Sequence, residues 1–297
     1  MNIIGHKKIF LTFSGILVLA SILAIAIFGF RTGIDFKGGT LWQIKFNQTV
    51  TESEIQNVFI SDLKVKDATI YPSDNGSYLI RLGNISEKDH QNFKNILSQK
   101  FNGLDELQYQ SIGPTIGDEL RHNAYWAIIL VLLGISLYVA YAFRKVSYPI
   151  KSWKYGIITL GTLFHDVIVP AGLLAVLGWK LGIEVDSNFV VALLVVMGFS
   201  VHDTIVVFDR IRENLLNQKG KSEFSEIVNT SVNQTLARSI NTSLALILVL
   251  LAMFFFGPTT LKYFILTILV GTTVGTYSSI FVASPLLTIW QKFSKVK

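Results

Sequence analysis

Six long apolar runs decide what this 297-residue chain can fold into. A helix needs about 20 mostly apolar residues to cross a bilayer. Four runs reach that length with no charged residue: Ile9–Phe30, Asn123–Phe143, Ser239–Leu261 and Tyr263–Gln291. Two more are interrupted only by a His-Asp pair: Tyr155–Trp179 and Ser187–Phe208. The pattern predicts a polytopic α-helical membrane protein with six transmembrane helices.

The first run is expected to remain as an anchor, because it exceeds the roughly 7–15 apolar residues of a signal peptide and lacks a clear small-residue cleavage site. The composition agrees with a membrane protein: 51% of residues are hydrophobic, 15% are charged, and the mean hydropathy is +0.48. With no cysteine in the chain, a disulfide framework and cysteine-based metal or nucleophile chemistry are excluded. We expect no cofactor.

Lysine and arginine are unevenly distributed between the loops. They gather before the first run, between the second and third, after the fourth, and after the last: Lys7, Lys8; Arg144, Lys145, Lys151, Lys154; Arg210, Arg212, Lys219, Lys221; Lys292, Lys295, Lys297. The positive-inside rule therefore predicts that both termini are cytoplasmic. The net charge of +6 follows from this topology, and no nucleic-acid partner is needed to explain it.

The long polar segment, residues 31–122, is then expected outside the membrane. Its patterning predicts strands and helices in the order strand–helix–strand–strand–helix–strand, at 39–47, 51–63, 68–72, 77–82, 86–101 and 104–113. That order is typical of the split βαβ, or ferredoxin-like, α+β domain. We therefore expect three parts: an anchor at 1–30, an exported domain at 31–122, and five further transmembrane helices within 123–297.

Two aspartates lie within the apolar runs, Asp166 and Asp203. The insertion of an aspartate at the centre of a membrane helix costs about 2.5–3.5 kcal/mol. One explanation is helix packing, with each carboxylate accepting a hydrogen bond from a nearby serine or threonine. The other is a proton or ion pathway, the usual role of intramembrane carboxylates. We favour the pathway for Asp203, and both explanations stay open for Asp166.

A third residue, Arg238, is expected near these aspartates because of its depth in the membrane. At about 1.5 Å per residue, Asp203 lies roughly 9 Å inside the cytoplasmic boundary at Asp209, and Asp166 lies deeper, at about 18 Å from Lys154. Arg238 marks the cytoplasmic end of the fifth run, so its side chain could reach toward Asp203. The three residues could form a ladder into the membrane. Alternatively, Arg238 is only an orientation signal.

The two His-Asp pairs do not indicate a metal site. Adjacent helix positions face different directions, so His165 with Asp166, or His202 with Asp203, cannot easily supply two ligands to one ion. The i, i+4 histidine spacing of helical zinc sites is also missing. In the last run, small residues recur at every fourth position: Gly271, Gly275, Ser279 and Ala283. This spacing favours close helix contact, either within the chain or with a partner's helix.

Several sequence blocks closely resemble the SecF family of protein-export membrane proteins. They are DFKGGTL (35–41), GPTIGDEL (113–120), HDVI (165–168), VHDTIVVFDRIREN (201–214), QTLARSINTS (234–243) and VGTYSSIFVASPL (274–286). The first block contains the structural motif residues Asp35, Gly38 and Gly39. The family resembles one half of an RND-type exporter, with six spans and a large exported domain after the first.

The resemblance implies a non-enzymatic function in the inner (plasma) membrane of a bacterial-type cell. A SecF protein pairs with a SecD-like subunit and the SecYEG channel, and uses the proton gradient to complete preprotein export after the ATP-driven stage performed by SecA. The proton-carrying aspartate of the family falls on Asp203, and a functionally important arginine falls on Arg238. Many relatives have asparagine where His202 stands, so the role of His202 is left open. The alternatives are half of an RND-type small-molecule exporter and an assembly scaffold without ion coupling.

Overall fold

The computed structural model describes residues 1–65, 67–73, 76–144, 150–218 and 222–295. The chain divides into two compact units. The helical unit comprises Met1–Arg31 and Trp126–Lys297, and the sheet unit comprises Thr32–Tyr125. Some residues used in the predictions lie outside the described ranges: the basic residues Lys145, Lys219, Lys221 and Lys297.

Within the described residues, six helices are long and apolar enough to cross a membrane. Five are single helices: α1 (Lys7–Phe28), α5 (Pro114–Ala142), α6 (Ser152–Leu181), α7 (Ser187–Gln218) and α8 (Phe224–Phe256). The sixth is built from α9 (Lys262–Ser278), the π-helix η4 (Ser279–Ala283) and α10 (Ser284–Lys295). The prediction of a helical membrane protein with six spans is confirmed.

Several helices are longer than the apolar runs that predicted them. α5 begins at Pro114 rather than Asn123, and α8 begins at Phe224 rather than Ser239. α7 continues past Phe208 to Gln218, where ion pairs one turn apart support its polar end. Arg210 lies 2.6 Å from Glu213, and Arg212 lies 3.2 Å from Asp209. Hydropathy finds only the part of a helix that suits lipid, whereas the charges at 209–213 are typical of a solvated, salt-bridged continuation of the helix, as α7 has it.

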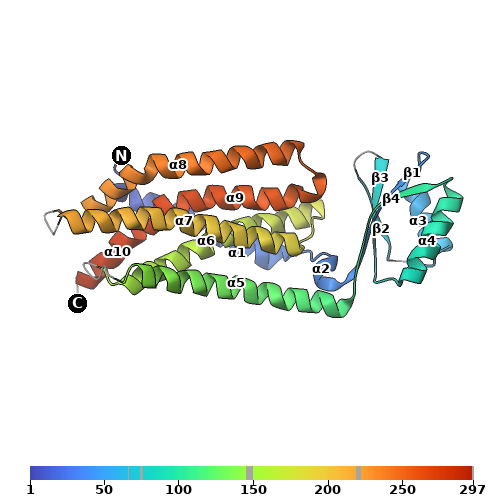
Figure 1. The fold of residues 1–297 in the computed structure, drawn as a ribbon, viewed down its shortest axis with the longest axis horizontal. Helices are drawn as coiled ribbons and strands as arrows, with labels where there is room; N and C mark the ends of the chain where they lie inside the picture. Colours follow the sequence, from blue (N-terminus) through green and yellow to red (C-terminus); the bar gives the residue numbers. More distant parts are fainter. Residues whose placement is uncertain (66, 74–75, 145–149, 219–221, 296–297) are drawn as a thin grey trace. The chain divides into compact units, whose positions relative to one another are not determined.

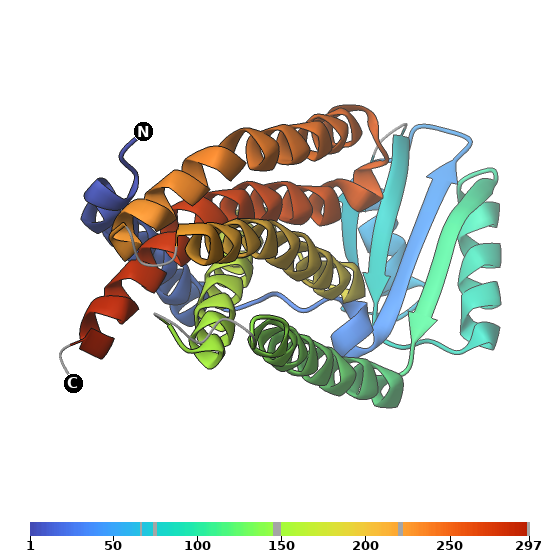
Figure 2. The same ribbon diagram turned by 60° about the vertical axis from the view of Figure 1, so that its left-hand side comes forward.

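Helices α6, α7 and α9 pack against one another at the centre of the helical unit, with α1 against α6 and α8 against α7 and α9 (Figures 1 and 2). Aromatic rings fill part of this core, where Tyr155 stacks on Phe143 with ring centroids 5.1 Å apart. Both chain ends lie at the same end of the helical unit (Figure 1). The N-terminus is fixed there because the Ile3 amide donates to Asn229 Oδ1 at 2.9 Å.

The sheet unit contains one four-stranded antiparallel sheet with the strand order β2-β3-β1-β4. Its elements follow the predicted order: β1 (Gly39–Phe46), α3 (Glu52–Ser61), β2 (Thr69–Pro72), β3 (Ser77–Leu82), α4 (Glu87–Lys100) and β4 (Leu104–Ile112). Helix α3 begins with a capping box formed by Thr51 and Glu54, and Ser86 caps α4. The core forms around the fully buried side chains of Trp42, Phe59 and Leu97.

Several short elements had no counterpart in the sequence prediction, and two of them lie beside residues singled out in the sequence. The first is α2 (Ile34–Lys37), a single helical turn before β1. The second is the π-helix η4, which continues α9 with a wider turn. One is only four residues long and the other continues a helix, so periodicity could detect neither. The π-helix matters most, because π-turns inside helices occur frequently at functional sites.

Candidate functional site

Asp166 of α6 lies at the junction of three helices and is completely buried. Its Oδ2 accepts two hydrogen bonds, from Ser200 Oγ of α7 at 2.5 Å and from Ser278 Oγ of α9 at 2.7 Å. Its Oδ1 lies 2.8 Å from Nδ1 of the neighbouring His165 ring. Three helices thus supply the groups that surround one carboxyl group in a segment suited to lipid.

Asp203 of α7 is also buried, with 6% of its surface exposed. Its Oδ2 accepts a hydrogen bond from Ser279 Oγ at 2.5 Å. Ser279 is the first residue of the π-helix, and the preceding residue, Ser278, binds Asp166. Successive residues of a helix point about 100° apart, because a turn contains 3.6 residues. Two adjacent serines can therefore reach carboxyl groups on two different helices.

We name the five residues Asp166, Asp203, Ser200, Ser278 and Ser279 the carboxylate cluster. Among the described residues, no lysine or arginine forms an ion pair with either aspartate. A charge buried in an apolar medium is costly unless it is paired and hydrogen-bonded. The serine bonds are of the kind considered for helix packing at both aspartates.

The structure does not bring the third predicted member of the ladder to this cluster. Arg238 lies on an exposed face of α8, and no ion pair joins it to Asp203 among the described residues. His202 is likewise exposed, although its neighbour Asp203 is buried. The cluster therefore contains both predicted aspartates but, in this arrangement, neither Arg238 nor His202.

The ridge of small residues explains how α9 comes close enough to α7 for these bonds. A Cβ added at Gly271 would collide with the Val196 side chain, and one at Gly275 would lie 3.0 Å from Ser200 Cβ. Further along the same face, Ser279 reaches Asp203 and Ala283 is fully buried. Of the two uses considered for the ridge, the structure shows contact within the chain.

Three members of the cluster were missed as hydrogen-bond donors. Ser200 and Ser278 were not singled out, and Ser279 was noted only for its small size. The available signal is weak: a serine in an apolar run has a hydroxyl group that lipid cannot bond, so it needs an acceptor within the protein. Hydroxyl groups of this kind commonly form hydrogen bonds between membrane helices.

The glycine motif that follows α1 has a structural explanation inside the sheet unit. Gly38 has a φ of +74°, and a Cβ there would lie 2.9 Å from the Pro114 backbone. Gly39 has a φ of +135°, and a Cβ there would lie 2.9 Å from the carbonyl oxygen of Leu82. Positive φ values and close backbone contacts both require glycine. Asp35 Oδ1 accepts a long hydrogen bond from Gln110 Nε2, at 3.4 Å.

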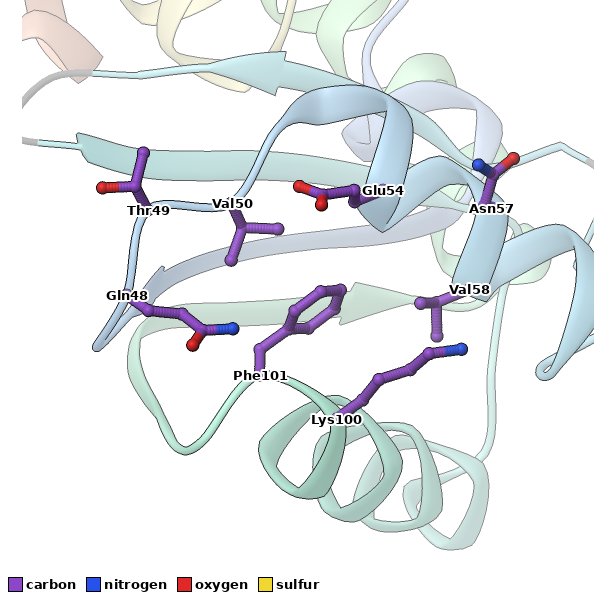
Figure 3. A pocket seen from close by; sticks show the side chains of 8 residues that line it. All are labelled: Gln48, Thr49, Val50, Glu54, Asn57, Val58, Lys100 and Phe101. Atoms are coloured by element: carbon purple, nitrogen blue, oxygen red, sulfur yellow. The ribbon is translucent and has the colours of Figure 1, made fainter.

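A cavity of about 370 Å³ opens in the sheet unit between α3 and α4 (Figure 3). Two charged side chains in its wall already have partners within the unit. Glu54 closes the capping box with Thr51, and Lys100 forms an ion pair with Asp62. We assign this cavity no role. Among the described residues, no three His, Asp or Glu side chains gather closely enough to hold a metal ion.

Comparison with known families gives two matches. Residues 92–293 match the family described as protein export membrane protein SecD/SecF, C-terminal, and residues 23–50 match the SecD/SecF GG motif. The second match contains Asp35, Gly38 and Gly39. The GG match therefore coincides with the two glycines whose backbone geometry excludes a side chain.

Curated proteins and solved structures agree with this assignment. The chain is 43% identical to the protein translocase subunit SecF of Thermobaculum terrenum, over 98% of this chain and 94% of that protein. It is 37% identical to the SecF subunit of Anaerolinea thermophila, with the same two coverages. The crystal structure of the translocon-associated membrane protein SecDF from Thermus thermophilus superimposes with a TM-score of 0.83 at 33% identity.

The SecDF match covers 98% of this chain but only 39% of the SecDF chain. A second SecDF structure, in a super-membrane-facing form, matches with a TM-score of 0.71 at 32% identity and also covers 39% of its chain. The chain is thus similar to a minor part of SecDF and to nearly the whole of the separate SecF subunits. Together with its six apolar helices and its glycine motif, this shows that the chain is a multi-pass membrane protein of the SecF family of protein translocase subunits.

Proposed function

We propose that the chain uses the proton-motive force to help complete preprotein export through the SecYEG channel, after the SecA-driven stage. The family supports a role in protein translocation. The observation that carries the ion-coupling part is the burial of Asp166 and Asp203, which are bonded to serine hydroxyls and paired with no lysine or arginine among the described residues. Intramembrane carboxyl groups in such surroundings mark ion pathways.

The proposed partner is a SecD-like subunit. The SecDF chain is much longer than this one, which matches 39% of it. A separate subunit equivalent to the rest of SecDF would complete the same assembly. The exposed apolar surfaces of α1 and α5 provide area for lipid and for a partner's helices.

In the proposed cycle, Asp203 takes up a proton from one side of the membrane and releases it on the other. Burial favours the neutral acid, whereas an approaching cation would favour the ionised form. Arg238 is the candidate for that cation, and it would have to move, because it is exposed and unpaired with Asp203 in this structure. Movement of α8 relative to α7 would then be part of the cycle.

We place the sheet unit outside the cell membrane as an exported ferredoxin-like domain, with both termini in the cytoplasm. The lysine and arginine distribution supports this orientation. Both ends lie at the same end of the helical unit, as an even number of spans requires (Figure 1). The strand order β2-β3-β1-β4 supports the ferredoxin-like assignment.

The decisive test replaces the carboxyl group of Asp203 while keeping its size. We expect Asp203→Asn to insert and bind its partner but to lose gradient-dependent export, because the amide cannot titrate. Asp203→Glu should keep part of the activity, and Arg238→Met should be impaired. The measurement is completion of preprotein translocation in inverted vesicles with and without a proton gradient. Asp209→Asn, an exposed carboxylate on the same helix, is the matched control. Full gradient stimulation in Asp203→Asn would refute the proposal.

Orientation can be tested separately, since the chain has no cysteine of its own. A single cysteine at Asn102, exposed in the sheet unit, should react with an impermeant thiol reagent added outside intact cells. A cysteine at Asn217, exposed near the end of α7, should react only after permeabilisation. The reverse labelling pattern would overturn the orientation and, with it, the direction of proton movement.

A further inference from the structure

The two intramembrane aspartates are held by neighbouring residues of one helix. Ser278, the last residue of α9, donates to Asp166 of α6, and Ser279, the first residue of the π-helix, donates to Asp203 of α7. Both serines are completely buried. Helix α7 links the same two sites a second time, because Ser200 donates to Asp166 three residues before Asp203. The carboxylate cluster is therefore a closed ring across three helices.

Each serine of the pair has a second acceptor within hydrogen-bond distance. Ser278 Oγ lies 3.1 Å from the carbonyl oxygen of Gly275, and Ser279 Oγ lies 3.0 Å from that of Thr276. A hydroxyl group has one proton to donate and can also accept. While a carboxyl group is ionised, its serine donates to it. When the carboxyl group is protonated, the acid O–H can donate to the serine oxygen and the serine can donate to the backbone carbonyl.

We propose that Ser278 and Ser279 are positioning residues that couple the protonation states of Asp166 and Asp203 through the junction of α9 and the π-helix. No covalent bond of serine breaks in this step. The proton that arrives stays on the carboxyl group, and each serine proton turns from the carboxylate to a carbonyl in the last turn of α9. Because the two serines are adjacent, a change at one carboxyl group alters the hydrogen bonds of the helix turn that also holds the other.

The surroundings leave few other titratable groups to account for such coupling. On α6, the His165 ring contacts Asp166, and its buried Nε2 has no partner among the described residues. On α9, the Tyr277 hydroxyl donates to the Phe10 carbonyl oxygen of α1 and so is engaged elsewhere. On α7, the group beside Asp203 is His202, which is exposed. His165 is therefore included as a variant in the test.

The inference rests on the proposed proton-coupled function, but its test requires no export. The full chain, purified and reconstituted in lipid vesicles, is titrated while the infrared absorption of protonated carboxyl groups is recorded. Asp166→Asn and Asp203→Asn assign the two signals. Sites that interact strongly titrate as a pair, with midpoints that differ by about one pH unit or more from those of the isolated sites. We expect the pH at the midpoint of the Asp166 titration to change by about one unit in Asp203→Asn.

Variants of the serines test whether Ser278 and Ser279 couple the protonation of Asp166 to that of Asp203. In Ser278→Ala/Ser279→Ala, the midpoint of Asp166 should no longer depend on the residue at 203, whereas Ser279→Thr, which keeps the hydroxyl, should retain the dependence. Ser200→Ala and His165→Gln should move the midpoint of Asp166 itself and preserve its dependence on residue 203. Ser239→Ala is the matched control, because this buried hydroxyl of α8 has no partner among the described residues.

Three results would overturn the inference. The titration midpoint of Asp166 could be the same with Asp or Asn at position 203 when both serines are present. The midpoint could still depend on residue 203 in the double alanine variant, or the dependence could be lost in Ser239→Ala. If the double variant does not insert, Ser279→Ala alone gives the answer, since it breaks the link at one serine. Failure of the proposed function looks different. In that case Asp203→Asn exports normally in the presence of a gradient, while the infrared coupling is unaffected.

Discussion

The two units of this protein surround carboxyl groups, partly buried in one unit and buried in the other, with different kinds of donor. In the sheet unit, Glu106 of β4 accepts from Trp42 Nε1 at 2.9 Å, lies 2.8 Å from His90 Nε2, and lies 3.6 Å from Lys94 Nζ. Burial acts to raise the pKa of Glu106, but the bonds to His90 and Trp42 and the charge of Lys94 outweigh it, so the pKa is below its ordinary value. In the helical unit, the donors to Asp166 and Asp203 are mainly serine hydroxyls.

The difference lies in what each donor can do after the carboxyl group gains a proton. An indole N–H and an ammonium group can only donate, so they favour the ionised form and oppose protonation. A serine hydroxyl can donate to a carboxylate or accept from an acid, so it suits both forms. The donors of Glu106 thus favour its anion, whereas the serine donors of the carboxylate cluster can form hydrogen bonds with either form of a carboxyl group.

If the sheet unit is held by its own core, it should be stable without the helices. We expect residues 31–122, expressed alone, to fold as a small α+β protein with a cooperative thermal transition. Trp42→Ala should lower its free energy of unfolding by about 3–5 kcal/mol, because a fully buried large side chain is removed. Leu107→Ala, at an exposed position of β4, is the control and should have little effect. A disordered wild-type fragment by circular dichroism would contradict the independent unit.

The sequence alone predicted the sheet unit well, because its signals are local. Alternation placed the strands, and Thr51 and Ser86 marked the helix starts within a residue or so of their observed positions. The hydrogen bonds of Glu106 could not be predicted, since they join residues of β1, α4 and β4 that come together only in the folded unit.

In the helical unit, hydropathy found the six long apolar helices of the described residues, and the cost of insertion singled out Asp166 and Asp203. Their donors were missed because a serine in an apolar run is unremarkable until helix packing decides what it faces. The depth argument for Arg238 was limited in the same way. A rise per residue fixes how deep a residue lies but leaves open the direction in which its side chain points. In this structure Arg238 is exposed, and among the described residues no ion pair joins it to Asp203.

The serines reach the aspartates because α9 packs closely against α7. We therefore expect a larger side chain at this helix contact to disturb the packing. Gly271→Ala places a methyl group against Val196 and should destabilise the folded protein by about 1–3 kcal/mol, the usual cost of overpacking. Gly198→Ala, on α7 with open space around its added Cβ, should be neutral. The measurement is thermal unfolding in detergent, with intrinsic fluorescence as the signal. Equal melting temperatures for the two variants would show that the ridge does not control helix contact.

The smallest expected effect concerns acid stability of the sheet unit, and it tests whether Glu106 is fixed as an anion. Its folded pKa is lower than its ordinary value of 4.5, so the unfolded chain binds the proton more readily. The associated stability is present above the ordinary value and is lost as the pH falls through the lower, folded value.

Glu106→Gln should therefore flatten the dependence of stability on pH below about pH 5, where the ordinary carboxyl group begins to bind protons. Some dependence should remain, because hydrogen bonds from Lys100 to Asp62 and from Gln91 to Glu87 also lower the pKa of those acids. Urea unfolding of the fragment at several pH values gives the comparison, with Glu52→Gln at an exposed position of α3 as the control. If Glu106→Gln and wild type lose stability in parallel as the pH falls, Glu106 is not held as an anion by its donors, and the contrast between the two units disappears.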